Sequence, residues 1–150
     1  MDKKKIILIG DHGGFELKEK VKAYLLKSSD FIVEDMSPKF VDLDDYPDIC
    51  IPAAKKVVKD NARGIFICGT GAGMCICANK VKGIRAAPAY DEKLARLIMQ
   101  HNDANVLCLG GRVMDEKKAI TIVRAWLSSS FLEGRYSRRN EKIAKFESEQ

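Results

Sequence analysis

The sequence lacks long apolar runs, and it has few aromatic residues. No apolar stretch approaches the roughly 20 residues that a membrane-spanning helix needs. The short apolar run after the N-terminal lysines is also too short for the core of a signal peptide. Aromatic residues make up 7% of the chain and do not alternate with basic residues, as they do in many single-stranded nucleic-acid binders. We therefore expect a cytoplasmic protein with no membrane partner and no nucleic-acid partner.

The sequence also lacks any CxxC pair, and it contains only two histidines. Cys75 and Cys77 would point about 200° apart on a helix, so the spacing does not suit zinc and we expect no metal. An odd set of five cysteines without a secretion signal indicates reduced thiols. The net charge of +5 comes from basic residues that are mostly interleaved with acids, which is typical of a solvated surface.

Short aliphatic runs alternate along the chain with segments of helical periodicity. Continuous aliphatic strands separated by helices indicate βαβ units and a parallel sheet that is covered on both faces. We predict a single α/β domain over residues 1–150, a three-layer αβα sandwich around a five-stranded, parallel, doubly wound (Rossmann-like) sheet. Asp91 and Asp115 are expected to cap the helices that follow them. The predicted strands are 6–9, 31–35, 64–68, 83–89 and 105–111, and the predicted helices are 15–27, 48–59, 74–80, 92–100, 116–127 and about 137–149.

Several chemically active side chains follow predicted strands. In doubly wound sheets, ligands bind beyond the carboxyl ends of the strands. The loops at that edge carry Asp11, His12, Cys68, Thr70 and Arg112. Individually, the aspartate and the threonine could be helix caps, the thiol a small buried hydrophobe, and the arginine a surface charge. Their convergence on one edge favours a functional site.

The glycine turn GTGAG (69–73) matches neither the GxGxxG dinucleotide motif nor the GxxxxGK[ST] P-loop. Glycines before a helix expose backbone N–H groups that stabilise an anion, either a bound phosphate or a charge that develops during a reaction. The same environment favours the thiolate of Cys68, which makes it a candidate base or nucleophile. The other cysteines lie in apolar patterns and are predicted to be packing residues: Cys50, Cys75, Cys77 and Cys108.

His101 ends a predicted helix and precedes a strand, so it belongs at the amino edge of the sheet, away from Cys68. Either the helix C-terminus stabilises a histidine cation there, or a partner subunit carries this loop to the site in a two-fold dimer. Arg135 and Arg139 are four residues apart and share a face if they are helical. They suit bidentate contacts to a phosphate; the alternative is a solvated terminal helix.

Five separated motifs, in order between Ile6 and Ile143, resemble those of the ribose-5-phosphate isomerase B family of sugar-phosphate isomerases, which also includes galactose-6-phosphate isomerase. They are GDHGGFELK, DYPD, CGTGAGMCICANKVKGIRAA, QHNDANVLCLGGR and EGRYSRRNEKI. The resemblance implies an aldose–ketose isomerase without metal or cofactor. Its reaction interconverts D-ribose 5-phosphate and D-ribulose 5-phosphate through an enediolate, in the non-oxidative branch of the pentose phosphate pathway.

The resemblance also implies a role for each site residue. Cys68 matches the base and His101 the residue that opens the furanose ring, with Asp11 on the other side of the ring and Thr70 assisting. Positions implied to contact the sugar and the enediolate are Tyr46, Gly69, Gly71, Ala72, Gly73 and Asn102. The implied phosphate-binding set is His12, Arg112, Arg135 and Arg139. The family is dimeric with sites shared between subunits, so we expect a homodimer or a tetramer in which helix 137–149 packs on a partner.

Members of this family differ in two features that bear on the substrate. Some family members use a glutamate base, and the galactose-6-phosphate enzymes divide the base and the ring-opening histidine between two different chains. Here Cys68 and His101 occur in one chain, which favours the ribose enzyme. The alternatives are an isomerase of a six-carbon sugar phosphate (allose 6-phosphate or galactose 6-phosphate) and a non-catalytic phosphate- or nucleotide-binding module.

Overall fold

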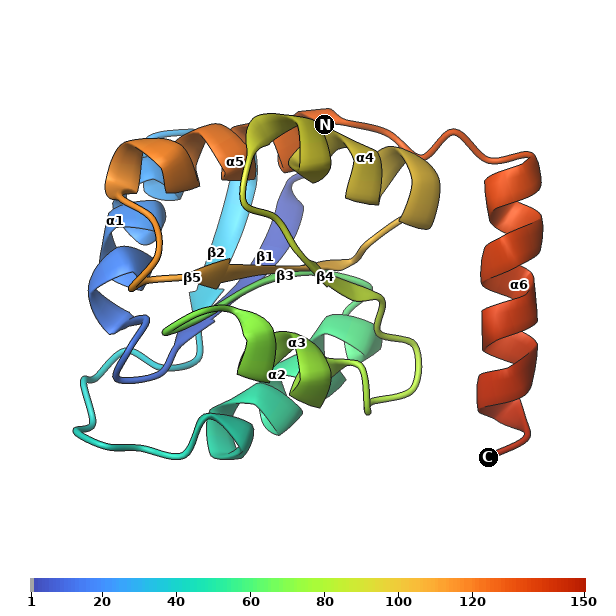
Figure 1. Ribbon diagram of the computed structural model, residues 1–150. Coiled ribbons are helices and arrows are strands. Elements are labelled where there is room, and N and C mark those ends of the chain that lie inside the picture. The colour runs from blue at the N-terminus through green and yellow to red at the C-terminus, as the bar shows by residue number, and fades with distance from the viewer. Residues whose placement is uncertain (1) are drawn as a thin grey trace.

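The computed structural model describes residues 2–150, and within them the strands form one five-stranded sheet in the order β2-β1-β3-β5-β4. Every neighbouring pair of strands is parallel. The predicted three-layer α/β fold is confirmed (Figure 1). The strands are β1 (Lys4–Gly10), β2 (Phe31–Asp35), β3 (Arg63–Cys68), β4 (Ala86–Pro88) and β5 (Val106–Gly110). The helices are α1 (Phe15–Leu26), α2 (Tyr46–Lys59), α3 (Ala72–Ala78), α4 (Glu92–Asn102), α5 (Glu116–Ser128) and α6 (Arg135–Ser148).

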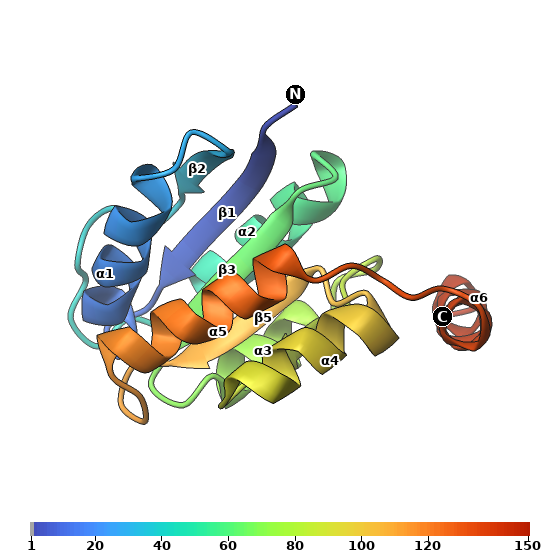
Figure 2. The same cartoon turned by 90° about the horizontal axis from the view of Figure 1, so that it is seen from above.

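The sheet has a separate hydrophobic core on each face. Helices α1, α4 and α5 cover one face, and α2 and α3 cover the other (Figures 1 and 2). Ile6 and Leu8 of β1 pack in the first core with Trp126, whereas Ile7 and Ile9 pack in the second core with Met74. Because both faces are buried, the central strands have continuous aliphatic runs and do not alternate with polar residues.

The predicted strand over 83–89 was wrong in extent, because β4 spans only Ala86–Pro88. Side chains take the place of ladder hydrogen bonds at its start: the Arg85 N–H donates to Asn105 Oδ1 (2.7 Å), and the Ala86 N–H donates to Asn79 Oδ1 (2.8 Å). Other predicted elements shift by one or two residues at their ends, as helix α3 does.

The two predicted helix caps are confirmed. Asp91 Oδ1 accepts a hydrogen bond from the Leu94 N–H (2.7 Å), and Asp115 Oδ1 accepts one from the Lys118 N–H (2.8 Å). Among the helices described over residues 2–150, none combines the length and the apolar character that crossing a membrane requires.

Helix α6 stands apart from the rest of the chain. None of its side chains is buried, and both views place it beside the sandwich (Figures 1 and 2). Polar contacts tether it: Asn140 Nδ2 donates to Asn102 O (3.0 Å), and the Gly83 N–H donates to Glu147 Oε2 (3.0 Å). Ile143 and Phe146 are 60% and 64% exposed. The apolar side chains of α6 are therefore not buried by its own chain.

A buried lysine connects α1 to the ends of β1 and β2. Lys18 is fully buried, and its Nζ donates to Asp35 Oδ2 (2.7 Å) and Ser37 O (2.7 Å). Ser37 Oγ in turn accepts from the Gly10 N–H (2.9 Å), one residue before Asp11. Burial alone would raise the pKa of Asp35, but hydrogen bonds from Lys18, from the Ser37 N–H and from Lys22 lower that pKa below its ordinary value. The carboxylate therefore stays ionised and paired inside the fold.

Replacing Lys18 by methionine is expected to lower the free energy of unfolding by about 3 kcal/mol, because Asp35 would be left buried with a single remaining ionic partner. The matched control is Lys22→Met, which removes the half-exposed partner of the same carboxylate and is expected to cost less than about 1 kcal/mol. Urea unfolding followed by circular dichroism measures both. Equal losses in the two variants would contradict a special role for the buried pair.

Candidate active site

Three loops meet at the carboxyl edge of the sheet, as the sequence predicts. They follow β1, β3 and β5, and backbone hydrogen bonds join them directly. The Gly111 N–H donates to Cys68 O (2.7 Å), the Arg112 N–H donates to Gly69 O (2.9 Å), and the Asp11 N–H donates to Ile67 O (3.1 Å). The loops therefore form one connected surface, which these backbone hydrogen bonds hold together.

Glycine is required where these loops touch. A Cβ atom at Gly14 would lie 2.2 Å from Ile67 O, and one at Gly111 would lie 2.5 Å from Gly13 O. Neither neighbour can give way, because both are backbone atoms. The glycines of the first and last loops thus allow the loops that carry Asp11, His12 and Arg112 to pack closely against the backbone around Cys68.

Cys68 lies at the end of β3, and its thiol is buried. The Gly71 N–H donates to Cys68 Sγ at 3.2 Å, and Gly71 has a φ of +91°, a conformation that favours glycine. This N–H group would stabilise a thiolate, because hydrogen bonds to an ionised acceptor are the stronger ones. Thr70 Oγ1 accepts from the Ala72 N–H (3.2 Å), but the N-cap of α3 is Gly71, so the alternative reading of Thr70 as the helix cap was wrong. The geometry brings the predicted base and the glycine turn together.

Asp11 is buried beneath the first loop, where its Oδ1 accepts from the Gly13 N–H (2.9 Å) and the Gly14 N–H (3.0 Å). The N-cap of α1 is Gly14, so the alternative reading of Asp11 as the helix cap was wrong. Burial raises the pKa of Asp11, and the two backbone N–H groups and His12 offset part of that rise. A carboxyl group with a raised pKa can exchange protons more readily near neutral pH.

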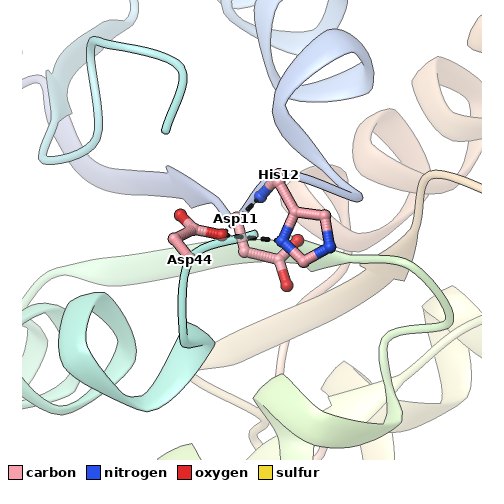
Figure 3. A group of neighbouring side chains, drawn as sticks. All are labelled: Asp11, His12 and Asp44. Atoms are coloured by element: carbon pink, nitrogen blue, oxygen red, sulfur yellow. Dashed lines mark hydrogen bonds and ion pairs between the residues drawn. The ribbon is translucent and has the colours of Figure 1, made fainter. Parts of the chain in front are cut away.

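His12 is paired with a residue that the sequence did not single out. His12 Nδ1 lies 2.8 Å from Asp44 Oδ1, and the His12 N–H also donates to that oxygen (2.8 Å) (Figure 3). The Asp44 hydrogen bond is the largest cause of a raised pKa at His12; desolvation and Arg112 lower that pKa, and Asp11 raises it further. The imidazole therefore favours the charged form, which suits a phosphate-binding role.

Two more predicted residues frame the site. The Arg112 side chain lies over the loop glycines, with its Nη1 3.2 Å from the position of a Cβ at Gly69. A cleft of about 420 Å³ opens beside Arg112 and His12. Tyr46, the first residue of α2, packs its ring against Gly73, where a Cβ would lie 2.6 Å from the ring. The glycine turn is thus covered on one side by an aromatic ring.

The remaining predicted residues form a second cluster at the other edge of the sheet. His101 and Asn102 end α4, and the His101 ring stacks on Tyr136 with centroids 4.4 Å apart. The guanidinium carbons of Arg135 and Arg139 lie 5.0 Å and 5.7 Å from the same tyrosine ring. Figure 1 shows α6 at the right end of the molecule, opposite the loops that follow β1, β3 and β5 at the left. One chain therefore does not bring the two clusters together.

A cation site is the other reading of the aspartates beside His12. Asp11, His12 and Asp44 place ligand-type atoms within 4.8 Å of one another. One oxygen of each aspartate already has hydrogen-bond partners, since Asp11 Oδ1 accepts from two backbone N–H groups and Asp44 Oδ1 accepts from His12. The geometry is that of a hydrogen-bonded ion pair and not of a coordination shell.

Two contacts of the candidate site were not predicted from the sequence. Asp44 lies in the irregular segment between β2 and α2, where three aspartates occur within four positions and no periodicity selects one of them. Tyr136 lies in a segment rich in arginine, between Arg135 and Ser137, and no sequence pattern marks it as the stacking partner of His101. The only available signal was position: Asp44 precedes the DYPD motif, and Tyr136 lies inside EGRYSRRNEKI.

Comparison with known proteins gives the family of the chain. Residues 6–143 match the model of a family described as Ribose/Galactose Isomerase. The chain is 39% identical over 145 residues to the Escherichia coli protein named ribose-5-phosphate isomerase B, covering 96% of this chain and 97% of that protein. It is 41% identical over 131 residues to the Mycolicibacterium smegmatis protein named D-erythrulose-4-phosphate isomerase 2, covering 85% of this chain and 86% of that protein.

A solved structure agrees with this placement. The chain superposes with a TM-score of 0.92 and 44% identity on the crystal structure of ribose-5-phosphate isomerase B from Mycoplasma genitalium, which holds bound ribulose-5-phosphate; the match covers 97% of each chain. The family model, the sequence identities and the fold all agree along nearly the whole length. The chain belongs to the ribose/galactose isomerase family.

Proposed function

We propose that this chain is an isomerase that interconverts D-ribose 5-phosphate and D-ribulose 5-phosphate. The observation that carries the proposal is the buried Cys68 thiol under the Gly71 N–H, on an edge that also holds Asp11, His12 and Arg112. The similarity of this chain to the Mycoplasma genitalium isomerase with bound ribulose-5-phosphate supports the same substrate pair.

Ring opening comes first, because the aldose is mostly a cyclic furanose. His101 donates a proton to the ring oxygen, and Asp11 on the other side of the ring accepts the proton of the anomeric hydroxyl. The bond between C1 and the ring oxygen then breaks, and C1 becomes an aldehyde. The raised pKa of Asp11 supports this exchange.

Isomerisation then moves one proton between neighbouring carbons. The Cys68 thiolate removes the proton from C2, and the electrons of that C–H bond form the C1–C2 double bond of an enediolate. The same proton returns to C1, and the proton of the O2 hydroxyl passes to O1. C2 thereby becomes the ketone and C1 the primary alcohol, so no oxidant or reductant is needed. Backbone N–H groups of residues 69–73, with Thr70, stabilise the charge that develops on the oxygens.

The phosphate group lies away from the reacting carbons, between cations from both clusters. His12 and Arg112 supply one side, and Arg135 and Arg139 supply the other. Tyr46 and Asn102 contact the sugar between them. Arginine suits this role because its planar guanidinium binds phosphate oxygens in pairs.

We also propose a homodimer in which each active site draws on two subunits. The Cys68 cluster and the His101 cluster lie at opposite edges of one sheet, and α6 buries none of its side chains in its own chain. A two-fold partner that packs on Ile143 and Phe146 would carry His101 and the arginines to the neighbouring Cys68. A pair of such dimers would give a tetramer.

The remaining assignments follow from the enzyme class. We propose that the chain acts as one isomerase domain in the cytoplasm. Five unpaired cysteines support this location, since a reducing compartment keeps thiols free.

A panel of aldose phosphates with four, five and six carbons tests the substrate. The highest kcat/KM is expected for D-ribose 5-phosphate, and a chelator such as EDTA is expected to leave the rate unchanged. A coupled assay for each ketose phosphate measures the turnover. A higher kcat/KM on allose 6-phosphate or galactose 6-phosphate would overturn the five-carbon assignment.

One relative favours a second candidate. The Mycolicibacterium smegmatis protein named D-erythrulose-4-phosphate isomerase 2 is 41% identical, so the four-carbon member of the panel tests a real alternative. If the enzyme preferred that substrate, Cys68 would still act as the base. Only the position at which the phosphate binds would differ from the proposal.

A further inference from the structure

The segment between β2 and α2 holds the His12 loop through a single carboxylate oxygen. Asp44 Oδ1 accepts from the His12 backbone N–H and is also 2.8 Å from its ring Nδ1 (Figure 3). The segment is fixed at two further points: Ser37 Oγ accepts from the Gly10 N–H, and Phe40 packs edge-on against Phe15 with ring centroids 5.6 Å apart. Contacts elsewhere in this segment therefore hold Asp44 in position beside His12.

The backbone next to Asp44 is strained. Leu43 has a φ of +52°, in the left-handed region that is unfavourable for a residue with a Cβ atom. Its side chain is 78% exposed, so burial of the leucine does not compensate for the strain. Contacts of the neighbouring residues must therefore maintain the left-handed conformation of Leu43. The hydrogen bonds between Asp44 and His12 are the contacts that depend on this conformation.

The Asp44 contact decides which ring nitrogen of His12 is free. Nδ1 is occupied by the carboxylate, so Nε2 is the nitrogen left for a ligand. His12 lines the cleft of about 420 Å³ with Arg112. A phosphate oxygen in that cleft would receive a hydrogen bond from Nε2–H and from the guanidinium.

The charge on His12 depends mainly on this same contact. The hydrogen bond to Asp44 is the largest cause that raises the pKa of His12, Asp11 raises it further, and Arg112 lowers it. A sugar phosphate is mostly a dianion above about pH 6, so an imidazolium there gains from both charge and hydrogen bonding. The other charged residues around the cleft are Glu16, Lys20, Asp115 and Glu116.

We propose that Asp44 is a positioning residue, which holds Nδ1 of His12 and leaves Nε2–H free to bind the substrate phosphate. Asp44 itself touches no reacting atom. The phosphate role rests on the proposed isomerase function, whereas the pairing of Asp44 with His12 does not.

An NMR titration tests the pairing without any turnover. The chain has two histidines, so His101→Asn leaves His12 as the only imidazole in the spectrum. Adding Asp44→Asn is expected to move the midpoint of the His12 titration to lower pH. The matched control is Asp42→Asn, which removes the same charge from an exposed position in the same segment and is expected to leave the midpoint in place. An unchanged midpoint with Asp44→Asn would overturn the proposal.

Kinetics of the otherwise unmodified enzyme test the phosphate role. With Asp44→Asn, the KM for ribose 5-phosphate is expected to rise roughly tenfold near pH 7.5, while kcat stays within about twofold. The two KM values should approach each other as the pH is lowered, because acid protonates His12 even where Asp44 no longer raises its pKa. Asp44→Glu restores the carboxylate and is expected to bring the KM near pH 7.5 part of the way back to the wild-type value.

The outcomes separate the two proposals. A KM ratio that is the same at every pH would mean that Asp44 only supports the fold, and the positioning role would be abandoned. If the wild-type enzyme turned over no sugar phosphate, the isomerase function would fail. The NMR midpoint would still decide whether Asp44 controls His12.

Discussion

Cys68→Ser is expected to lower kcat by about 10³-fold while substrate still binds, because a serine hydroxyl does not ionise near neutral pH and general-base catalysis is lost. The oxygen is smaller than sulfur and can keep the hydrogen bond from the Gly71 N–H. The substitution leaves the glycine turn and the cations proposed to bind the phosphate unchanged. Binding made in both the ground state and the transition state therefore survives.

The measurement is the rate of ribulose 5-phosphate formation, with substrate affinity followed separately by calorimetry. Cys77→Ser is the matched control, since it changes a half-buried thiol in the same stretch and should leave both quantities nearly unchanged. Chemical alkylation does not isolate the base, because a hydrogen bond with Cys108 lowers the pKa of Cys75 to about 7 and makes a second thiol reactive.

The same variant separates an enzyme from a binding module. If wild-type protein bound sugar phosphates but Cys68→Ser changed no rate, the thiol would not be the base. A chain that bound phosphate and never produced ketose would match the non-catalytic alternative. Loss of turnover with retained binding would assign the chemistry to Cys68.

The sheet and its carboxyl edge were predictable because they depend on local patterns. Aliphatic runs such as Ile6–Ile9 mark strands buried on both faces, and the βαβ order places their ends at one edge. That rule was enough to bring Cys68 together with Asp11 and Arg112. The caps at Asp91 and Asp115 were also predictable, since a cap acts within three residues along the chain.

Other features depend on contacts between distant segments, which no local pattern encodes. β4 shortens because Asn79 and Asn105 supply side-chain partners from other elements. Asp44 reaches His12 across 32 positions of sequence, from a segment with no periodicity. Three neighbouring aspartates could reach His12 by sequence position, and the path of the backbone decides which of their carboxylates contacts it.

The role of His101 is the feature of the candidate site that a single chain explains least. Its position at the amino edge was predictable and is confirmed, because it ends α4. Its separation from the Cys68 cluster is what led us to propose that a second copy supplies it, whereas its place in the last turn of α4 also fits a histidine that the helix C-terminus stabilises. In the proposed dimer, the second copy would pack on α6, which has no buried side chains in its own chain. From the sequence alone, this segment is typical of a solvated helix.

His101→Asn is expected to lower kcat/KM on ribose 5-phosphate by about 10²-fold, because the ring oxygen loses its proton donor. The stacking of the ring on Tyr136 is partly lost as well, so the matched control is Tyr136→Phe, which keeps an aromatic ring and removes the hydroxyl that Arg135 contacts. That control should retain most of the rate. A His101→Asn enzyme with wild-type kcat/KM would contradict the ring-opening role.

Mixing the two inactive variants tests the shared site directly. A hybrid of a Cys68→Ser subunit with a His101→Asn subunit contains one site with both defects and one site with both native groups. Random exchange at equal amounts makes half of the dimers hybrids, so about one quarter of the wild-type activity should return. Native mass spectrometry with one tagged variant establishes that exchange has occurred. Exchange without recovered activity would place Cys68 and His101 of the same chain in one site, and α6 would then have to bend back toward its own glycine turn.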